Sequence, residues 1–310
     1  MKKIEDIAII GMGALGVMFG NLFAENLGGE AVTFIADDKR IARYRAEGVY
    51  CNGKKCAFAF ANGNNFKKPA DLLIFAVKGT ALDQAIAQAQ PLVGEDTVIL
   101  SLLNGIVSEA LIGAQLGHQH ILYCVAQGMD AVKLGNKLAY THLGQLCIGT
   151  LPTEPEKQPL LQRTVELFDR VGLPFTVDAD IKRRLWGKWM LNVGVNQVLM
   201  VACGTYGTIQ QPGEARDRMI GAMREVIMLA RLEGVDLTEA DLNGYVALMD
   251  TLSPAGMPSM RQDGIEKRPS EVAFFAGTVI EKAKKHGVAV PVNEALYASI
   301  REMEDWYHQA

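Results

Sequence analysis

The sequence has few cysteines, few aromatic residues and no long uninterrupted apolar run. Its five cysteines are scattered and contain no Cys-x-x-Cys pair, so we expect neither a disulfide framework nor a zinc site, and a reducing cytoplasm fits better. No stretch approaches the roughly 20 apolar residues of a membrane-spanning helix. The histidines are isolated or two residues apart, which predicts no metal site.

An excess of charge of one sign is also missing. The chain has 31 Lys and Arg against 35 Asp and Glu, for a formal net charge of -4, so we expect neither nucleic acid nor an anionic membrane as a partner. Lys2 and Lys3 precede an apolar run, but Glu5 and Asp6 interrupt the basic N-terminal region, and Gly11, Gly13 and Gly16 break the apolar run. We therefore expect no signal peptide. A length of 310 residues suffices for two domains.

The first half alternates short apolar runs with segments compatible with helices. Continuous apolar strands separated by helices predict a parallel sheet covered on both faces, and right-handed crossovers then make a doubly wound Rossmann domain. We expect residues 137–149 and 174–177 to add late strands that close the sheet, and residues 150–157 to form a surface loop. The earlier strands are expected at 7–11, 31–36, 71–78, 97–103 and 121–127, with helices at 14–26, 38–46, 80–88 and 107–116.

The pattern changes near residue 178, after which strand signals nearly vanish. Long helix-compatible segments follow at 181–201, 214–233, 239–251, 270–285 and 292–308. We therefore predict an α/β chain with a dinucleotide-binding Rossmann domain over residues 1–178 and an all-helical substrate and catalytic domain over residues 179–310.

A glycine-rich turn follows the first expected strand. The pattern Gly-x-Gly-x-x-Gly between a strand and a helix allows a tight turn and a close approach of the backbone to a pyrophosphate at the helix N-terminus. The same turn also occurs in doubly wound folds that bind no ligand. The cofactor-binding candidates here are Gly11, Met12, Gly13, Ala14, Leu15 and Gly16.

The residues beyond the second and third strands bear on the choice of cofactor. Asp37 lies where an acidic residue would bind the ribose hydroxyls of NAD. Lys39, Arg40 and Arg43 follow it and either hold a 2′-phosphate or form a solvated helix face. Lys78 lies at the carboxyl end of the third expected strand, and ligands of doubly wound sheets bind beyond the carboxyl ends of the strands.

A polar stripe marks the first long helix of the second half. Lys188, Asn192 and Asn196 recur every four residues and share one face of a helix that is otherwise apolar. Such buried polar groups need partners, either in a core network that joins helices or on the floor of a cleft between domains. In a reductase, a lysine ammonium can stabilise a developing alkoxide and deliver its proton, while amides fix the substrate.

Asn104-Gly105 follows the fourth strand. Its position beyond a carboxyl end suits contact with nicotinamide and substrate, whereas an Asn-Gly pair also makes an ordinary turn.

With these pieces collected, the chain resembles the ketopantoate reductase (2-dehydropantoate 2-reductase) family over almost its whole length. No single piece decides the resemblance, but their order and spacing do. The matching pieces are the glycine turn at 11–16, Lys78, Asn104-Gly105, the stripe Lys188–Asn192–Asn196, and the segments 258–263, 269–271 and 284–293.

The resemblance implies an N-terminal Rossmann domain and a C-terminal domain like that of 6-phosphogluconate dehydrogenase. It implies reduction of ketopantoate to pantoate with NADPH, a step toward pantothenate and coenzyme A. Lys188 would be the general acid, and Glu271 would assist it or hold the substrate. The residues implied to bind substrate are Asn104, Asn192, Asn196 and Ser259, with Asn104 also near the nicotinamide.

The chain departs from the family pattern in three places. Asp37 stands where the family usually has an arginine that grasps the 2′-phosphate, so NADH is an alternative to NADPH. The segment 128–132 lacks the threonine-rich pattern often found there, and Arg261 is an extra cation beside Ser259. A related reductase of another 2-keto or 3-hydroxy acid and a dinucleotide sensor without turnover remain alternatives, and a homodimer through the helical half is left open.

Overall fold

The chain folds into two compact units. The computed structural model describes residues 2–66 and 68–307. The first unit runs to Leu103 and resumes over Ser108–Ile181, while the second contains Asn104–Val107 and the chain from Lys182 onward. The four residues Asn104–Val107 thus belong by their contacts to the helical part of the chain, although the strand before them belongs to the sheet.

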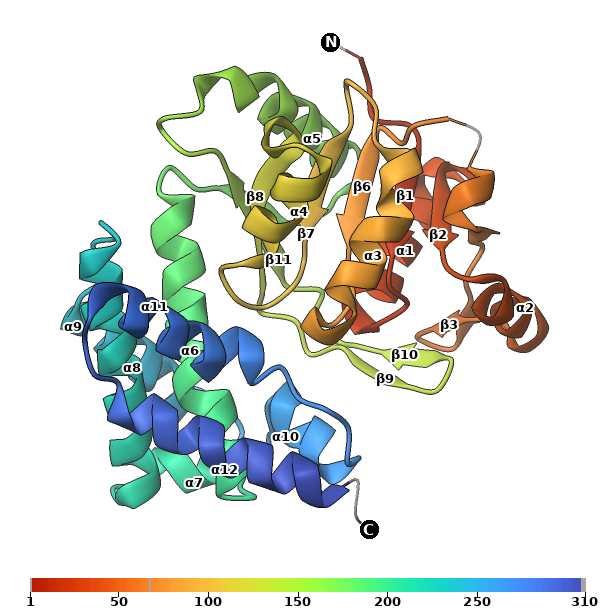
Figure 1. Ribbon diagram of the computed structural model, residues 1–310. Coiled ribbons are helices and arrows are strands. Elements are labelled where there is room, and N and C mark those ends of the chain that lie inside the picture. The colour runs from red at the N-terminus through yellow and green to blue at the C-terminus, as the bar shows by residue number, and fades with distance from the viewer. Residues whose placement is uncertain (1, 67, 308–310) are drawn as a thin grey trace. The chain divides into compact units, whose positions relative to one another are not determined.

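An eight-stranded sheet forms the centre of the first unit (Figure 1). Its order is β12-β11-β8-β7-β6-β1-β2-β5; the strands from β8 to β5 are parallel, β11 runs antiparallel to β8, and β12 runs parallel to β11. This is the predicted doubly wound sheet. The strands are β1 (Ile7–Ile10), β2 (Val32–Ile35), β5 (Ala59–Ala61), β6 (Leu72–Phe75), β7 (Val98–Ser101), β8 (Ile121–Gln127), β11 (Gln145–Gly149) and β12 (Phe175–Val177).

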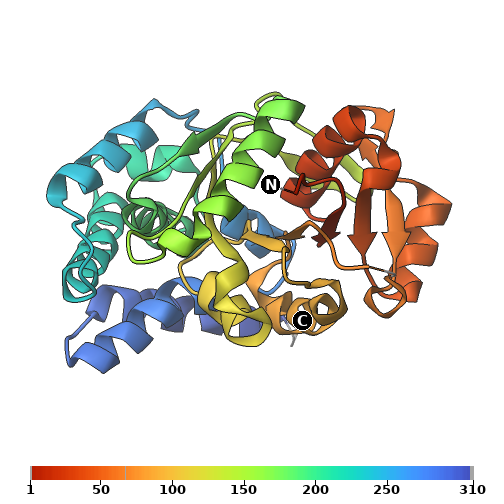
Figure 2. The same ribbon diagram turned by 90° about the horizontal axis from the view of Figure 1, so that it is seen from above.

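Helices cover both faces of this sheet. α1 contacts α5, and α3 contacts α4; Figure 2 shows the two pairs on opposite faces. Every residue of β1, β6 and β7 is buried, which explains why these strands read as continuous apolar runs without alternation. The helices of this unit are α1 (Ala14–Leu27), α2 (Asp38–Glu47), α3 (Leu82–Ala89), α4 (Ser108–Leu116) and α5 (Gln158–Val171).

The expected single strand over 137–149 is wrong. Its first part, β10 (Lys137–Ala139), joins a second small sheet of order β4-β3-β10-β9, and only β11 enters the main sheet. Asp130 explains the break between them, because its carboxylate accepts hydrogen bonds from the backbone N–H groups of Thr141 and His142. The other strands of the small sheet are β3 (Tyr50–Cys51), β4 (Lys54–Lys55) and β9 (Val132–Leu134).

The expected surface loop at 150–157 is present, with residues 152, 153, 155 and 156 exposed, but it is not entirely solvated. It ends in a 3-10 turn, Pro155–Lys157, and the Lys157 side chain is buried. Its ammonium pairs with the Glu154 carboxylate at 2.7 Å and lies over the ring of Tyr123. A charge is tolerated there because it is paired inside the unit.

The second unit is helical apart from its loops. α6 is 21 residues long and forms its core with Trp189, Val193 and Leu199, all fully buried. The expected helix 270–285 is instead a π turn (Ala273–Gly277) followed by α11, and His308 of the expected last helix lies outside the described residues. The helices are α6 (Ile181–Val201), α7 (Tyr206–Gln210), α8 (Glu214–Leu232), α9 (Glu239–Thr251), α10 (Ser259–Ile265), α11 (Thr278–His286) and α12 (Pro291–Tyr307).

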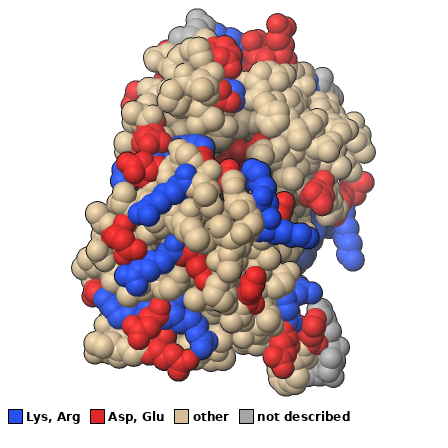
Figure 3. All heavy atoms as spheres, turned by 60° about the vertical axis from the view of Figure 1, so that its left-hand side comes forward, with Lys and Arg blue, Asp and Glu red and all other residues tan. Residues whose placement is uncertain are grey.

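The surface carries charges of both signs. Figure 3 shows Lys and Arg interspersed with Asp and Glu over the face it presents. Among the described residues, no helix has the length and apolar character needed to cross a membrane.

Candidate active site

The glycine turn between β1 and α1 has geometry that two of its glycines require. Gly11 has φ 111°, and a Cβ there would lie 2.4 Å from the carbonyl oxygen of Ala76. A Cβ on Gly16 would lie 2.1 Å from the carbonyl oxygen of Gly11. A larger residue at position 11 would push the turn away from the backbone after β6, and one at position 16 would push α1 away from the turn.

Gly13 is different, because the space beside it is open. It is exposed at the N-cap of α1, and a Cβ there would meet its nearest neighbour, the carbonyl oxygen of Ala76, at 3.4 Å. Over this described stretch, no side chain caps the helix and its first turn contains no acidic residue. The first N–H groups of α1 and the positive end of its dipole are therefore available to an anion, so the turn fits a dinucleotide pyrophosphate.

A pocket opens beyond the carboxyl ends of β1, β2 and β6. Met12 of the glycine turn lines it together with Arg40 and Tyr44 of α2 and Gln84 and Gln88 of α3. Tyr44 and the two glutamines were not predicted from the sequence. The spacing of Arg40 and Tyr44, four residues apart on one helix, is the signal that could have found Tyr44.

Asp37 has a local structural task. It is the N-cap of α2, where its Oδ1 accepts a hydrogen bond from the backbone N–H of Arg40 at 2.8 Å. Its Oδ2 lies 3.4 Å from Nε of Arg40. The negative charge is therefore partly matched by the same arginine that lines the pocket. Lys78 is exposed at the turn after β6.

The polar stripe of α6 lies on one continuous helix. Lys188 and Asn192 are half-buried, and Asn196 is buried. Asn192 donates a hydrogen bond through Nδ2 to Oδ1 of Asn104 at 3.4 Å. The structure thus brings together two predicted site residues that lie 88 positions apart in the sequence.

The turn that follows Glu271 lies beside the same region. Trp189 of α6 donates from its indole N–H to the carbonyl oxygen of Phe274 at 3.0 Å. Gly105 has φ 111°, and a Cβ built on it would lie 3.7 Å from that same oxygen. Glu271 itself is half-buried, and its carbonyl accepts a hydrogen bond from the N–H of Phe274. Ser259 is exposed at the first residue of α10.

Asn293 lies in one of the sequence segments that match the family, and its role in this structure is to join helices in a buried hydrogen-bond network. It is fully buried and donates to the Glu225 carboxylate at 2.7 Å, while its Oδ1 accepts from Gln197 at 3.2 Å. Gln197 in turn accepts a hydrogen bond from the N–H of Ala276. This network joins α6, α8, α12 and the π turn, and it shows that α6 carries a satisfied core network immediately beside its predicted substrate-binding stripe.

Within residues 2–66 and 68–307, no group of three or more His, Cys, Asp and Glu side chains could hold a metal ion.

Similar proteins place these features in a family. The family described as ketopantoate reductase PanE/ApbA matches residues 7–153, and its C-terminal part matches residues 180–304. A 2-dehydropantoate 2-reductase of Vibrio cholerae is 26% identical over 241 residues, which are 78% of this chain and 80% of that protein.

Solved structures share the fold over nearly the full length. A PanE/ApbA family ketopantoate reductase from Ralstonia eutropha has a TM-score of 0.85 at 23% identity, covering 98% of this chain and 99% of that one. D-mandelate dehydrogenase, solved with NADH and anilino(oxo)acetate, has a TM-score of 0.86 at 22% identity with the same coverage. Since the two family matches together span most of the sequence, this chain belongs to the ketopantoate reductase family of oxidoreductases.

Proposed function

We propose that this protein is a 2-dehydropantoate 2-reductase that reduces ketopantoate to pantoate, a step toward pantothenate and coenzyme A. The observation that carries the proposal is the polar face of α6, where Lys188, Asn192 and Asn196 follow one another and Asn192 bonds to Asn104. A lysine followed by convergent amides is the set of groups that a keto-acid reductase needs.

In this proposal Lys188 is the general acid. Reduced nicotinamide, when bound, supplies the hydride, and the keto oxygen then carries the negative charge. The Lys188 ammonium would stabilise that charge and donate its proton to the oxygen. Glu271 would hold Lys188 in position or bind a hydroxyl of the substrate.

The amide groups would orient the keto acid. Because Oδ1 of Asn104 accepts from Asn192, Asn104 can present its own Nδ2 donor to the substrate, and Asn192 can present Oδ1 as an acceptor. Asn196 and Ser259 would add further hydrogen bonds. Fixed donors and acceptors of this kind lower the entropic cost of reaching the reactive geometry.

We further propose that residues 1–178 bind the cofactor and that residues 179–310, together with Asn104, bind the substrate. The turn Gly11–Gly16 would hold the pyrophosphate, and Arg40 and Lys78 would favour NADPH by contacting a 2′-phosphate. The Arg40–Asp37 pair supports this choice, because it offsets the repulsion that a lone carboxylate would exert on the phosphate. NADH is the alternative if Asp37 binds the ribose hydroxyls instead.

The decisive experiment is a steady-state assay of the full chain with a panel of 2-keto acids, each tested with NADPH and with NADH. The panel contains ketopantoate and the α-keto acid of mandelate, phenylglyoxylate, because a D-mandelate dehydrogenase shares the fold. We expect the highest kcat/KM for ketopantoate. A higher value for another keto acid would favour a related reductase, and cofactor binding without any turnover would favour a dinucleotide sensor.

A further inference from the structure

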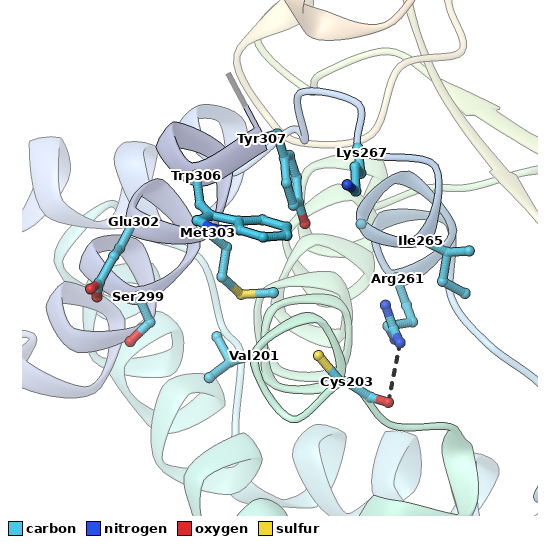
Figure 4. Close-up of a pocket in the computed structure, with 11 residues that line it drawn as sticks. Val201, Cys203, Arg261, Ile265, Lys267, Ser299, Glu302, Met303, Trp306 and Tyr307 are labelled. Atoms are coloured by element: carbon cyan, nitrogen blue, oxygen red, sulfur yellow. Dashed lines mark hydrogen bonds between the residues drawn. The ribbon is translucent and has the colours of Figure 1, made fainter. Parts of the chain in front are cut away.

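The helical unit contains a cavity that is built from residues with no part in the proposed reaction. Its volume is about 620 Å³, within the usual size of small-molecule sites. The end of α6, the helix α10 with the turn after it, and the last turns of α12 form its walls (Figure 4).

One wall of the cavity contributes a guanidinium that is only partly satisfied. Arg261 donates from Nη2 to the backbone carbonyl of Cys203 at 3.3 Å. Its Nε is buried and has no hydrogen-bond partner in the described part of the chain. The guanidinium thus lines the cavity with part of its hydrogen-bonding capacity unused, and an arginine side chain is well suited to bind a carboxylate.

Lys267 is a second cation in the lining of the cavity, and its backbone has a conformation that is unfavourable for residues other than glycine. It has φ 52° at the end of α10, a left-handed position that glycine usually takes. Its ammonium lies 4.9 Å from the centre of the Trp306 ring. Backbone strain of this kind is commonly found at binding sites.

The remaining wall is largely apolar and aromatic. Trp306 is 55% exposed, and Tyr307 lies beside it with ring centroids 6.3 Å apart. Met303 and Val201 continue the apolar lining. Figure 4 shows the Glu302 carboxylate at the opposite end of the cavity from Arg261. Two cations against one carboxylate leave the lining with one net positive charge, and these cations lie at one end.

We propose that this cavity is a binding site for a small aromatic monocarboxylate. The carboxylate lies against Arg261 and Lys267, and the aromatic ring packs on Trp306. A dianion would exceed the one positive charge of the lining, and an aliphatic acid would lose the ring contacts. The site is separate from the proposed chemistry of Lys188.

The test is calorimetric titration of the full chain with benzoate, compared with the uncharged benzamide and the non-aromatic cyclohexanecarboxylate. We expect benzoate to bind in the millimolar range, because a ligand of this size has few atoms with which to gain affinity. Benzamide should bind at least about 10-fold more weakly, since it lacks the charge-assisted hydrogen bonds.

Variants of the cavity lining test whether benzoate binds in this cavity. Arg261→Gln should weaken benzoate binding by about 10-fold or more, and Trp306→Leu by several-fold, while the matched surface change Arg218→Gln should leave it unchanged. Trp306 is exposed, so its replacement keeps the test open if Arg261→Gln fails to fold. Lys188→Met should also bind benzoate as wild type does.

Two results would overturn the proposal. One is the absence of benzoate binding to the wild type throughout the millimolar range. The other is binding that Lys188→Met abolishes and that Arg261→Gln and Trp306→Leu both retain, which would assign benzoate to the substrate site. Neither result depends on whether ketopantoate is the substrate of the enzyme.

Discussion

Asn192 of α6 donates a hydrogen bond to the side-chain oxygen of Asn104. Asn104 lies three positions after the last residue of strand β7. The bond fixes which atoms each amide has left for a ligand. Asn104 keeps its Nδ2 donor, and Asn192 keeps its Oδ1 acceptor and one N–H. The pair therefore acts as a single polar group, although its members come from distant parts of the sequence.

The first prediction follows from that pairing. Asn104→Ala and Asn192→Ala should each lower kcat/KM for the keto acid, and the double variant should lose less than the product of the two single effects. Residues in contact typically couple by about 0.5–3 kcal/mol, and the first replacement already disorders the partner amide. The measurement is a double-mutant cycle on kcat/KM. Multiplicative losses would show that the two amides act independently.

The second prediction concerns proton transfer. Lys188→Ala should lower kcat at least ~100-fold, since general acid catalysis contributes on that scale. Binding of NADPH, measured by fluorescence titration, should persist, because the glycine turn belongs to the other unit. The exposed Lys284→Ala on α11 serves as the matched control. A kcat near that of the wild type in Lys188→Ala would remove Lys188 from the mechanism.

The third prediction separates the two cofactors. Asp37→Asn keeps an N-cap residue on α2 and removes its charge, so the helix should stay intact. We expect the ratio of kcat/KM for NADPH over NADH to rise, because the carboxylate no longer opposes the 2′-phosphate. Arg40→Gln should lower the same ratio by about 10-fold or more, the effect of losing a charge-assisted hydrogen bond. If both variants keep the wild-type ratio, neither residue selects the cofactor.

Much of the fold could be predicted because its strands and long helices have strong local patterns. α6 over Ile181–Val201, α9 over Glu239–Thr251 and β8 over Ile121–Gln127 have the predicted bounds. The small sheet could not be predicted, since its strands have only two or three residues and no apolar period. α10 was also missed, because seven residues make too few turns to show a helical repeat.

The candidate site was predictable only where one helix carries it. Spacing alone places Lys188, Asn192 and Asn196 on a common face, since helix geometry is local. The bond from Asn192 to Asn104 is a tertiary contact that no local pattern encodes. The same holds for Arg40, whose side chain the sequence could not assign either to solvent or to a ligand, and which the structure places in the pocket lining beside Asp37.

The last prediction concerns Glu109, a buried carboxyl in the first turn of α4. Its Oε2 accepts a hydrogen bond from Ser108, whose hydroxyl also contacts that of Ser101, and its Oε1 is buried without a partner among the described residues. Burial raises the pKa of Glu109 from 4.5 to about 7, and the hydrogen bonds from Ser108 and from its own backbone only partly oppose the rise.

This raised pKa makes stability depend on pH in a defined direction. Between pH 4.5 and about 7 the folded chain keeps a proton on Glu109 that the unfolded chain releases. The free energy of unfolding should therefore fall as pH rises through this window, by about 1.36 kcal/mol for each unit of pKa shift, and then level off.

The variant Glu109→Gln keeps the shape of the side chain but cannot titrate. It should match the wild type in stability below pH 4.5 and become progressively more stable than the wild type as the pH rises to about 7, and the difference should persist above that pH. Urea unfolding at a series of pH values measures the difference, with the exposed Glu166→Gln of α5 as the control. If the free energies of unfolding of the wild type and of Glu109→Gln differ by a constant amount from pH 4 to pH 8, the pKa of Glu109 is not raised in the folded protein.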